Sequence, residues 1–163
     1  MWATRATRAN ARYHSKVSNL DVLDAANPPE GFIPHSRKSP FTDPFEPLFA
    51  RVDTAQYSLG TRLRPIHCNS RGLVHGGFIA TLADNAMGLS CGVALYNAGR
   101  KVLGMVTVNL SVDYVGQAQV GDWLETDSTI VKLGGSLAFL ETRLISNDTV
   151  VARANATFKI KTA

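Results

Sequence analysis

The chain has 163 residues, of which 45% are hydrophobic and 18% are charged. These values are ordinary for one globular domain with a single core. No run of about 18 apolar residues is free of interruption, and no apolar run follows a charged N-terminal start, so neither a membrane span nor a secretory signal is expected. Cys68 and Cys91 are too few for a disulfide framework and have no metal-ligand spacing, which favours a reduced, cytoplasmic setting.

The net charge of +4 resides in an N-terminal arm. Residues 1–16 contain four basic side chains and no acid, so the remaining residues are balanced. The four are at helical spacing: Arg5, Arg8, Arg12 and Lys16. A solvated or disordered arm accounts for this pattern, and so does contact with an anionic partner or a neighbouring subunit. Nucleic-acid binding is not expected, because no aromatic-basic module follows.

Residues 27–47 contain six of the seven prolines. Proline fixes φ and removes a backbone donor, so this stretch is predicted to be an extended, irregular lead-in. Its aromatic residues predict that it lies against the rest of the chain: Phe32, Phe41, Phe45 and, just beyond it, Phe49. We therefore divide the chain into an arm and lead-in over residues 1–47 and a compact domain over residues 48–163.

The longest apolar segment spans residues 76–96. Its Ala, Leu, Met, Ile and Phe residues favour a helix, and its apolar surface is wider than one amphipathic stripe. We therefore expect a helix that other structure wraps nearly all round. Before it, a strand is expected within residues 50–63 and a polar loop over residues 65–73.

Strands are predicted for the rest of the chain. Within residues 106–114 the apolar residues alternate, which predicts one face with Val106, Val108, Leu110, Val112 and Tyr114 and another with Thr107. Strands over about 122–133 and 136–146 follow, and Asn147-Asp148 makes a tight turn into 149–161. In the last strand one face is predicted to hold Val150, Ala152, Ala154, Ala156, Phe158 and Ile160. One strand, a buried helix and about four strands predict an α+β domain, with an antiparallel sheet curled around its helix.

Asp84 is the only ionisable acid or base between Gly76 and Tyr96. Burying an isolated carboxylate costs several kcal/mol, so an unpaired one tends to protonate. A bond to a backbone amide, or a gap to solvent, would satisfy this carboxylate in a purely structural role. The residues expected on its face of the helix are small: Ala80, Thr81, Gly88 and, nearby, Cys91. They leave room for a substrate or a partner chain.

Two glycines follow His75 at the start of the predicted helix. Gly76 and Gly77 allow a ligand to approach the backbone, and the first N–H groups of a helix have no internal acceptor. At the positive end of the helix dipole they would stabilise a carbonyl oxygen that gains negative charge. A flexible joint between loop and helix is the alternative reading. His75 either acts as an acid or base or fixes the loop through a ring hydrogen bond.

Asn69 lies in the polar loop, six residues before His75. Its amide could hold a water or a substrate carbonyl, although a loop Asn is more often a turn residue. Cys91 is interpreted as a core thiol, because no activating partner is identifiable. The remaining histidines form no recognisable metal cluster: His14, His35 and His67.

The run from Asn69 to Asp84 resembles the signature of hotdog-fold thioesterases of the phenylacetate-pathway type. The Asn precedes the His-Gly-Gly by six residues, and the Asp follows that His by nine. Residues 121–126 and 134–139 are also similar to that family, and the resemblance covers about residues 57–161. It implies a hotdog fold, in which an antiparallel sheet wraps a central helix. It also implies an acyl-CoA thioesterase that hydrolyses an acyl- or aryl-CoA to the free acid and CoA.

Carried onto this chain, the resemblance implies that Asp84 is a general base or nucleophile. The Gly77 N–H would polarise the thioester carbonyl, and Asn69 would orient substrate or water. Thr107 matches a Ser/Thr position that helps to place the water. His75 is the fifth residue expected to take part in catalysis. Contact with substrate is implied for four further residues: Gly76, Thr81, Gly135 and Ser136.

The resemblance also implies an oligomer. In the family the Asp comes from the opposite subunit to the Gly and Asn, so the site needs a homodimer or a dimer of dimers. No metal or organic cofactor is implied, and related branches that use a Glu on this helix are not matched. The basic arm departs from the family's core.

Two other functions fit the same fold. A non-catalytic acyl-CoA-binding regulator would bind its ligand without releasing thiol, but it has no need of Asp84. An enoyl-CoA hydratase or dehydratase usually relies on a His paired with an acid at other positions, so His75 alone supports it poorly. The residues do not choose the acyl group, since aromatic, medium-chain and branched groups would all fit an apolar groove.

Overall fold

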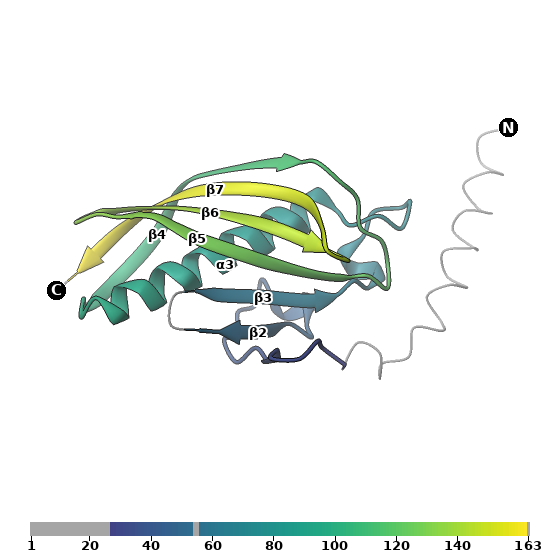
Figure 1. The fold of residues 1–163 in the computed structure, drawn as a ribbon, viewed down its shortest axis with the longest axis horizontal. Coiled ribbons are helices and arrows are strands. Elements are labelled where there is room, and N and C mark those ends of the chain that lie inside the picture. The colour runs from purple at the N-terminus through teal and green to yellow at the C-terminus, as the bar shows by residue number, and fades with distance from the viewer. Residues whose placement is uncertain (1–26, 54–55, 163) are drawn as a thin grey trace, which may run out of the picture.

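A computed structural model describes residues 27–53 and 56–162. The basic arm predicted over residues 1–16 lies outside the described residues. In Figure 1 a curved sheet covers one side of a single long helix. The strands before the helix are β1 (Ile33–Pro34), β2 (Phe49–Val52) and β3 (Tyr57–Arg62), with short 3-10 turns η1 (Asp43–Phe45) and η2 (Pro65–His67). The helix and later strands are α3 (Gly76–Asn97), β4 (Val102–Tyr114), β5 (Trp123–Leu133), β6 (Leu137–Ser146) and β7 (Thr149–Thr162).

The seven strands form one antiparallel sheet in the order β1-β2-β3-β5-β6-β7-β4. This confirms the expected α+β architecture of a sheet around a central helix. The strand expected within residues 50–63 is present as β3, but the range also contains most of β2, which pairs antiparallel with β3. Asp53, just after β2, accepts a hydrogen bond from the Gln56 N–H, just before β3. Part of the Pro-rich lead-in also joins the sheet, since β1 pairs with β2.

Helix α3 buries one face against the sheet. The buried positions recur at i, i+1, i+4 and i+5, which is the spacing of one helical face. They are Phe78, Ile79, Leu82, Ala83, Ala86, Met87, Ser90, Cys91 and Leu95. The expectation of a helix wrapped nearly all round is therefore wrong for a single chain: the opposite face, with Ala80, Asp84 and Gly88, is only half-buried. By length and composition α3 could cross a membrane, but the core helix of a globular protein meets the same criteria.

Strand β4 contains a bulge in its pairing with β7. Thr107 pairs with Phe158, but Asn109 pairs with the next residue back, Thr157, so Val108 is an extra residue in β4. A bulge of this kind shifts the alternation of side chains by one position. Side chains before and after Val108 therefore do not follow one continuous in-and-out alternation.

The bulge corrects the predicted faces of this strand. Val106 and Val108 are 62% and 61% exposed, whereas Leu110 packs against the core, so the three do not share one face. Before the bulge it is Met105 and Thr107 that face the helix. Sequence alternation missed this because it assumes an uninterrupted strand.

Strand β7 follows the predicted pattern from Ala152 to Ile160, whose alternate side chains are buried. Val150 departs from it, because a register shift between Leu144 and Ile145 leaves Val150 exposed and buries its neighbour. The tight turn before β7 is confirmed: Asn147 and Asp148 have φ values of 48° and 60°. Two successive residues with positive φ are typical of the two-residue loops that connect the strands of a β-hairpin.

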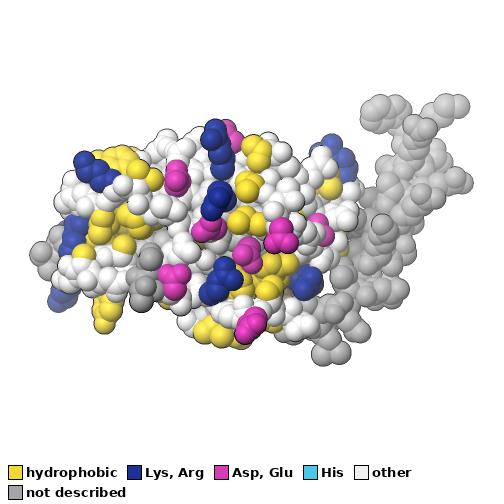
Figure 2. Space-filling view, in the orientation of Figure 1, with side chains coloured by type: hydrophobic (Ala, Val, Ile, Leu, Met, Phe, Trp, Pro, Cys, Tyr) yellow, Lys and Arg dark blue, Asp and Glu magenta, His cyan; other side chains and the backbone are white. Residues whose placement is uncertain are grey.

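The outer face of the sheet carries ion pairs between neighbouring strands. Arg153 bonds to Asp113 on β4 at 2.9 Å, and Arg143 bonds to Asp127 on β5. Figure 2 shows acidic and basic side chains interleaved across the middle of the molecule. Exposed pairs of this kind contribute little to stability.

His67 joins the lead-in to the start of α3. Its buried ring stacks on Phe78, with centroids 4.3 Å apart and planes at 10°. Nδ1 accepts a hydrogen bond from the Arg64 N–H, and Nε2 lies 3.0 Å from the Phe45 carbonyl oxygen, which can only accept. These two bonds require a neutral ring protonated at Nε2. Burial lowers the pKa of His67 to about 4.

This lowered pKa predicts a pH-dependent stability. In the unfolded chain His67 titrates near its ordinary pKa of 6.5, so between pH 6.5 and 4 the unfolded state binds a proton that the native state does not. The free energy of unfolding should therefore fall as the pH drops through this window, by about 3 kcal/mol in total. Urea unfolding at pH 6.5 and 5 measures the first part of the loss, above the range in which most carboxylates titrate.

The matched control is His67→Asn, which keeps an acceptor near the Nδ1 position but does not titrate. This variant should be less stable at pH 7 and should show a flatter pH dependence than the wild type. Parallel curves for the two proteins would contradict the assignment.

Candidate active site

Asp84 and Thr107 are brought together by α3 and the bulged strand β4. The Thr107 hydroxyl donates a hydrogen bond of 2.8 Å to Asp84 Oδ1. Without the bulge Thr107 would share the outward face predicted from alternation, and this bond could not form. Asp84 Oδ2 accepts no hydrogen bond from the described residues. The carboxylate is half-exposed rather than buried, which corrects the expected burial, because the sheet leaves this side of the helix open.

Asp84 lines a groove of about 400 Å³ between β4 and the lead-in. Its lining combines hydroxyl, amide and apolar groups: Ser39, Phe41, Thr42, Ala80, Thr81, Asp84, Asn85, Thr107 and Leu110. The small helical residues expected beside Asp84, Ala80 and Thr81, are both present. The lead-in wall was not predicted, because no local motif in residues 39–42 indicates which part of the domain they contact.

His75 closes the start of α3. Its Nδ1 accepts a hydrogen bond of 2.9 Å from the Gly77 N–H, so the ring acts as the N-cap of the helix. Of the two roles considered for His75, this bond is the one expected if the ring fixes the local backbone. A role for His75 as an acid or base stays a prediction. The Gly77 N–H, which is expected from the sequence to polarise the thioester carbonyl, therefore already donates its hydrogen bond to His75.

Gly76 presents the N–H that lacks an acceptor among the described residues. Its carbonyl accepts a hydrogen bond of 3.0 Å from the Tyr114 hydroxyl. A Cβ at Gly76 would lie only 3.2 Å from the Tyr114 ring, so glycine allows this close packing. The first turn of the helix thus offers one open donor in a fixed position, at the positive end of the helix dipole.

Asn69 forms a turn at the base of this loop. Its Oδ1 accepts hydrogen bonds from the N–H groups of Arg71, at 2.9 Å, and Leu73, at 3.4 Å. This is the turn role that a loop Asn commonly has. The bonds occupy the side-chain oxygen and leave the amide N–H groups as the part of Asn69 that could reach a ligand.

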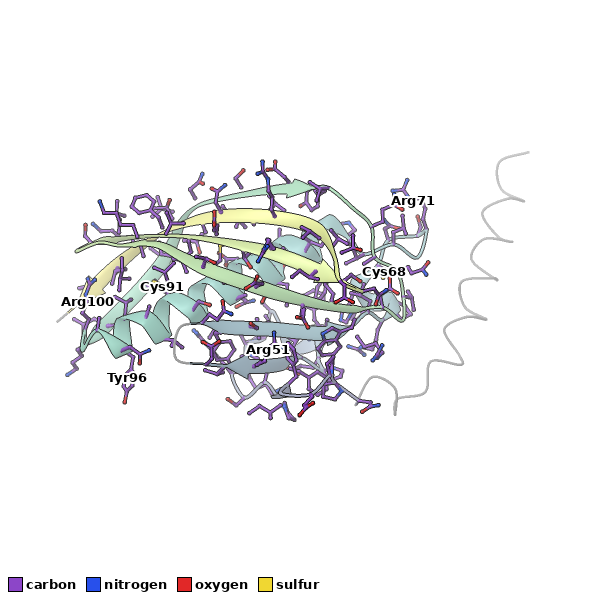
Figure 3. The ribbon with its side chains drawn as sticks, in the orientation of Figure 1. Arg51, Cys68, Arg71, Cys91, Tyr96 and Arg100 are labelled. Atoms are coloured by element: carbon purple, nitrogen blue, oxygen red, sulfur yellow. The ribbon has the colours of Figure 1, made fainter. Side chains whose placement is uncertain are left out.

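The other predicted substrate contacts lie at different places along the helix. Thr81 is in the groove, where its hydroxyl donates 2.9 Å to the Gly77 carbonyl. Gly135 and Ser136 are in the β5–β6 turn, which Arg100 binds just beyond the end of α3. Figure 3 shows Arg71 at the end where the helix begins and Arg100 at the opposite end. Gly135 and Ser136 therefore do not meet Asp84 within one chain.

Gly76 and Asp84 are also separated. They stand eight positions apart on one helix, which corresponds to about 12 Å along its axis. Across that distance, a thioester whose carbonyl oxygen is bonded to the Gly76 N–H is too far from Asp84 for Asp84 to assist attack on its carbonyl carbon. The two halves of the predicted machinery are both present in the chain but do not converge on one point.

Neither cysteine has the character of a nucleophile. Burial raises the pKa of both the Cys91 thiol and the Cys68 thiol to about 11. Cys91 is fully buried, which confirms its interpretation as a core thiol. It lies on the buried face of α3 and not on the open face with Asp84, where the helical spacing had placed it nearby. Within residues 27–53 and 56–162, no three His, Cys, Asp or Glu side chains are grouped as metal ligands.

Comparison with known proteins identifies the family. A sequence profile of the thioesterase superfamily matches residues 71–153, just over half of the chain, so the chain belongs to that superfamily. A Pseudomonas aeruginosa protein, named provisionally as an esterase, is 42% identical over 135 residues, which cover 82% of this chain and 98% of that protein. Human acyl-coenzyme A thioesterase 13 is 32% identical over 83 residues, covering 51% of this chain and 56% of the human protein.

Solved structures support the fold. A phenylacetic acid degradation protein from Thermus thermophilus superposes with a TM-score of 0.64 at 22% identity, over 74% of this chain and 98% of that one. A Streptococcus mutans protein bound to acetyl CoA superposes with a TM-score of 0.65 at 22% identity, over 78% of this chain and 95% of that one. At this level of identity the likeness concerns the fold, and it confirms the predicted hotdog architecture.

The cap made by His75 gives a direct prediction. His75→Ala should lower the free energy of unfolding by about 1 kcal/mol, because the Gly77 N–H loses its acceptor. His75→Asn restores a side-chain oxygen at the same position and should recover most of that loss. Urea unfolding at neutral pH measures both variants. Equal losses for Ala and Asn would mean that the ring stabilises the loop by packing and not by capping.

Proposed function

We propose that the protein is an acyl-CoA thioesterase, which hydrolyses an acyl- or aryl-CoA to the free acid and CoA. The observation that carries the proposal is the bond from Thr107 to Asp84 in an open groove. A carboxylate with one oxygen held and the other accessible is a suitable base for a water molecule. The names of the human relative and of the acetyl-CoA complex support a CoA thioester as the substrate.

In the reaction the water oxygen forms a bond to the thioester carbonyl carbon, and the C–S bond then breaks. As general base, Asp84 takes the water proton at Oδ2 while Thr107 keeps the other oxygen in place. The sulfur leaves as a thiolate and takes up the proton that Asp84 removed from water, giving the free acid, free CoA and the original carboxylate. Attack by Asp84 itself, as a nucleophile, would instead join its oxygen to the carbonyl carbon and release the CoA thiolate. Water would then hydrolyse the resulting anhydride to the free acid and the Asp84 carboxylate, and the proton set free would go to the thiolate.

We assign polarisation of the carbonyl to the Gly76 N–H rather than to the Gly77 N–H. The Gly77 N–H is bonded to His75, and the Gly76 N–H has no acceptor among the described residues. A donor already fixed at a helix start stabilises the developing oxyanion without reorganisation.

The working site requires two chains. The separation of about 12 Å between Gly76 and Asp84 along one helix prevents both from acting on one thioester. A second copy could place its own Gly76 beside the first chain's Asp84. Strand β4 supports such a partner, because it is an edge strand with exposed apolar side chains, among them Leu103 and Val106. We therefore propose a homodimer, alone or within a tetramer.

The first test is the loss of the base. Asp84→Asn keeps the shape of the side chain, so the folded variant should retain its fold but lose about 10² or more in kcat. Release of free thiol from a panel of acyl-CoA esters measures the rate. Asp113→Asn, the same change on the outer face of the sheet, is the matched control and should leave the rate unchanged. Full turnover by folded Asp84→Asn protein would exclude the assignment.

The second test removes the carbonyl donor. Gly76→Pro deletes the N–H at the first helical position, where proline is tolerated and where the extended backbone of His75 suits a following proline. The expected loss in kcat is about 10² to 10³.

Gly76→Ala is the matched control, because it adds the same contact with Tyr114 but keeps the N–H. It should retain most of the activity. Equal losses in the two variants, measured by thiol release, would show that crowding of Tyr114 and not the N–H is responsible. An enoyl-CoA hydration assay on the wild type should give no product if hydrolysis is the reaction.

A further inference from the structure

The wall of the groove opposite β4 belongs to the lead-in, and Phe41 is its large apolar side chain. We propose that Phe41 contacts the apolar tail of the acyl group and thereby makes the enzyme prefer acyl groups longer than acetyl. The inference rests on the proposed function, because it takes a thioester positioned at Asp84 as its starting point.

Phe41 is placed where such a tail would lie. It lines the same groove as Asp84 and Thr107, with Ala80 and Leu110 providing further apolar lining. Within a single chain Phe41 is 67% exposed, although it is an aromatic residue in a folded part of the chain. A fixed aromatic ring left exposed beside a reactive group offers apolar surface that a ligand can bury.

The turn that carries Phe41 is held in place from within. The Ser39 and Thr42 hydroxyls are 2.9 Å apart and bonded, and the Ser39 N–H donates to Asp43 Oδ1 at 3.1 Å. Thr42 is itself buried. These bonds engage the Ser39 and Thr42 hydroxyls with each other, so Phe41 is the large apolar group that this wall offers to a ligand.

Aromatic contacts fix the same turn to the helix. The Phe41 ring meets Phe45 edge-on at 6.1 Å between centroids, and Phe45 in turn contacts Phe78 at 5.1 Å. Phe45 also accepts the bond from His67 that joins the lead-in to the loop before α3. Phe41 is therefore preorganised, so a bound tail does not have to order it first.

The wall precedes the part of the chain that the superfamily profile matches. That part begins at residue 71 and contains Asp84 and Thr107. A wall outside this shared segment can vary without disturbing the residues proposed for hydrolysis. This arrangement separates the choice of acyl group from the chemistry.

The test compares two substrates in the wild type and three variants. Burial of about 55 Å² of apolar surface corresponds to about a tenfold change in affinity. In Phe41→Ala, kcat/KM for hexanoyl-CoA should fall about tenfold, while kcat/KM for acetyl-CoA stays within about twofold. Phe41→Leu, which keeps most of the apolar surface, should recover hexanoyl-CoA hydrolysis. Phe139→Ala removes an exposed Phe from the outer face and should change neither substrate.

Three results would overturn the proposal. Equal losses for both substrates would show that Phe41 has a structural role, no loss for hexanoyl-CoA would show no contact, and a gain would show that the ring obstructs the tail. Calorimetric binding of the non-hydrolysable S-hexyl-CoA gives a readout independent of turnover. Absent hydrolysis by the wild type would refute the proposed function, whereas weaker S-hexyl-CoA binding to Phe41→Ala would still identify the contact.

Discussion

One rigid helix carries both the carbonyl donor and the carboxylate, and their spacing on it constrains everything else about the site. Eight residues of α3 separate Gly76 from Asp84, so they lie about 12 Å apart along the axis. The helix cannot bend to bring them together, because its buried face is packed against the sheet along most of its length. This spacing requires a second chain, and the open face of α3 and the exposed edge strand β4 leave room for one.

The bond between Thr107 and Asp84 shows how a local irregularity in a strand can position a reactive group. A regular β4 would direct Thr107 away from the helix, and the extra residue at Val108 turns it inward. The position of the hydroxyl then selects which carboxylate oxygen is held and which is accessible. At the helix start His75 makes an equivalent selection between two backbone donors, because its ring uses the Gly77 N–H and leaves the Gly76 N–H open.

Much of this architecture can be predicted from the sequence. The apolar run of α3, the paired left-handed residues Asn147 and Asp148 and the last three strands follow from periodicity and turn chemistry. Asp84 stands out because a single carboxylate in an apolar helix needs a reason to be there.

The missed features depend on contacts between distant segments. The bulge in β4 is a property of its pairing with β7, and alternation within one strand cannot indicate it. The use of the Gly77 N–H depends on the rotamer of His75, and the wall at Phe41 depends on how the lead-in packs. The degree of burial of Asp84 was overestimated for the same reason, since a helical pattern does not say which of its faces a sheet will cover.

The most direct test of the two-chain site is complementation between inactive variants. Asp84→Asn and Gly76→Pro chains, co-expressed with different tags, pair at random, and half of the dimers are then mixed. Each mixed dimer contains one site with both substitutions and one site with neither. The account predicts that the co-expressed protein recovers about a quarter of wild-type thiol release per chain. Activity no greater than the mean of the two separate variants would contradict a site shared between chains.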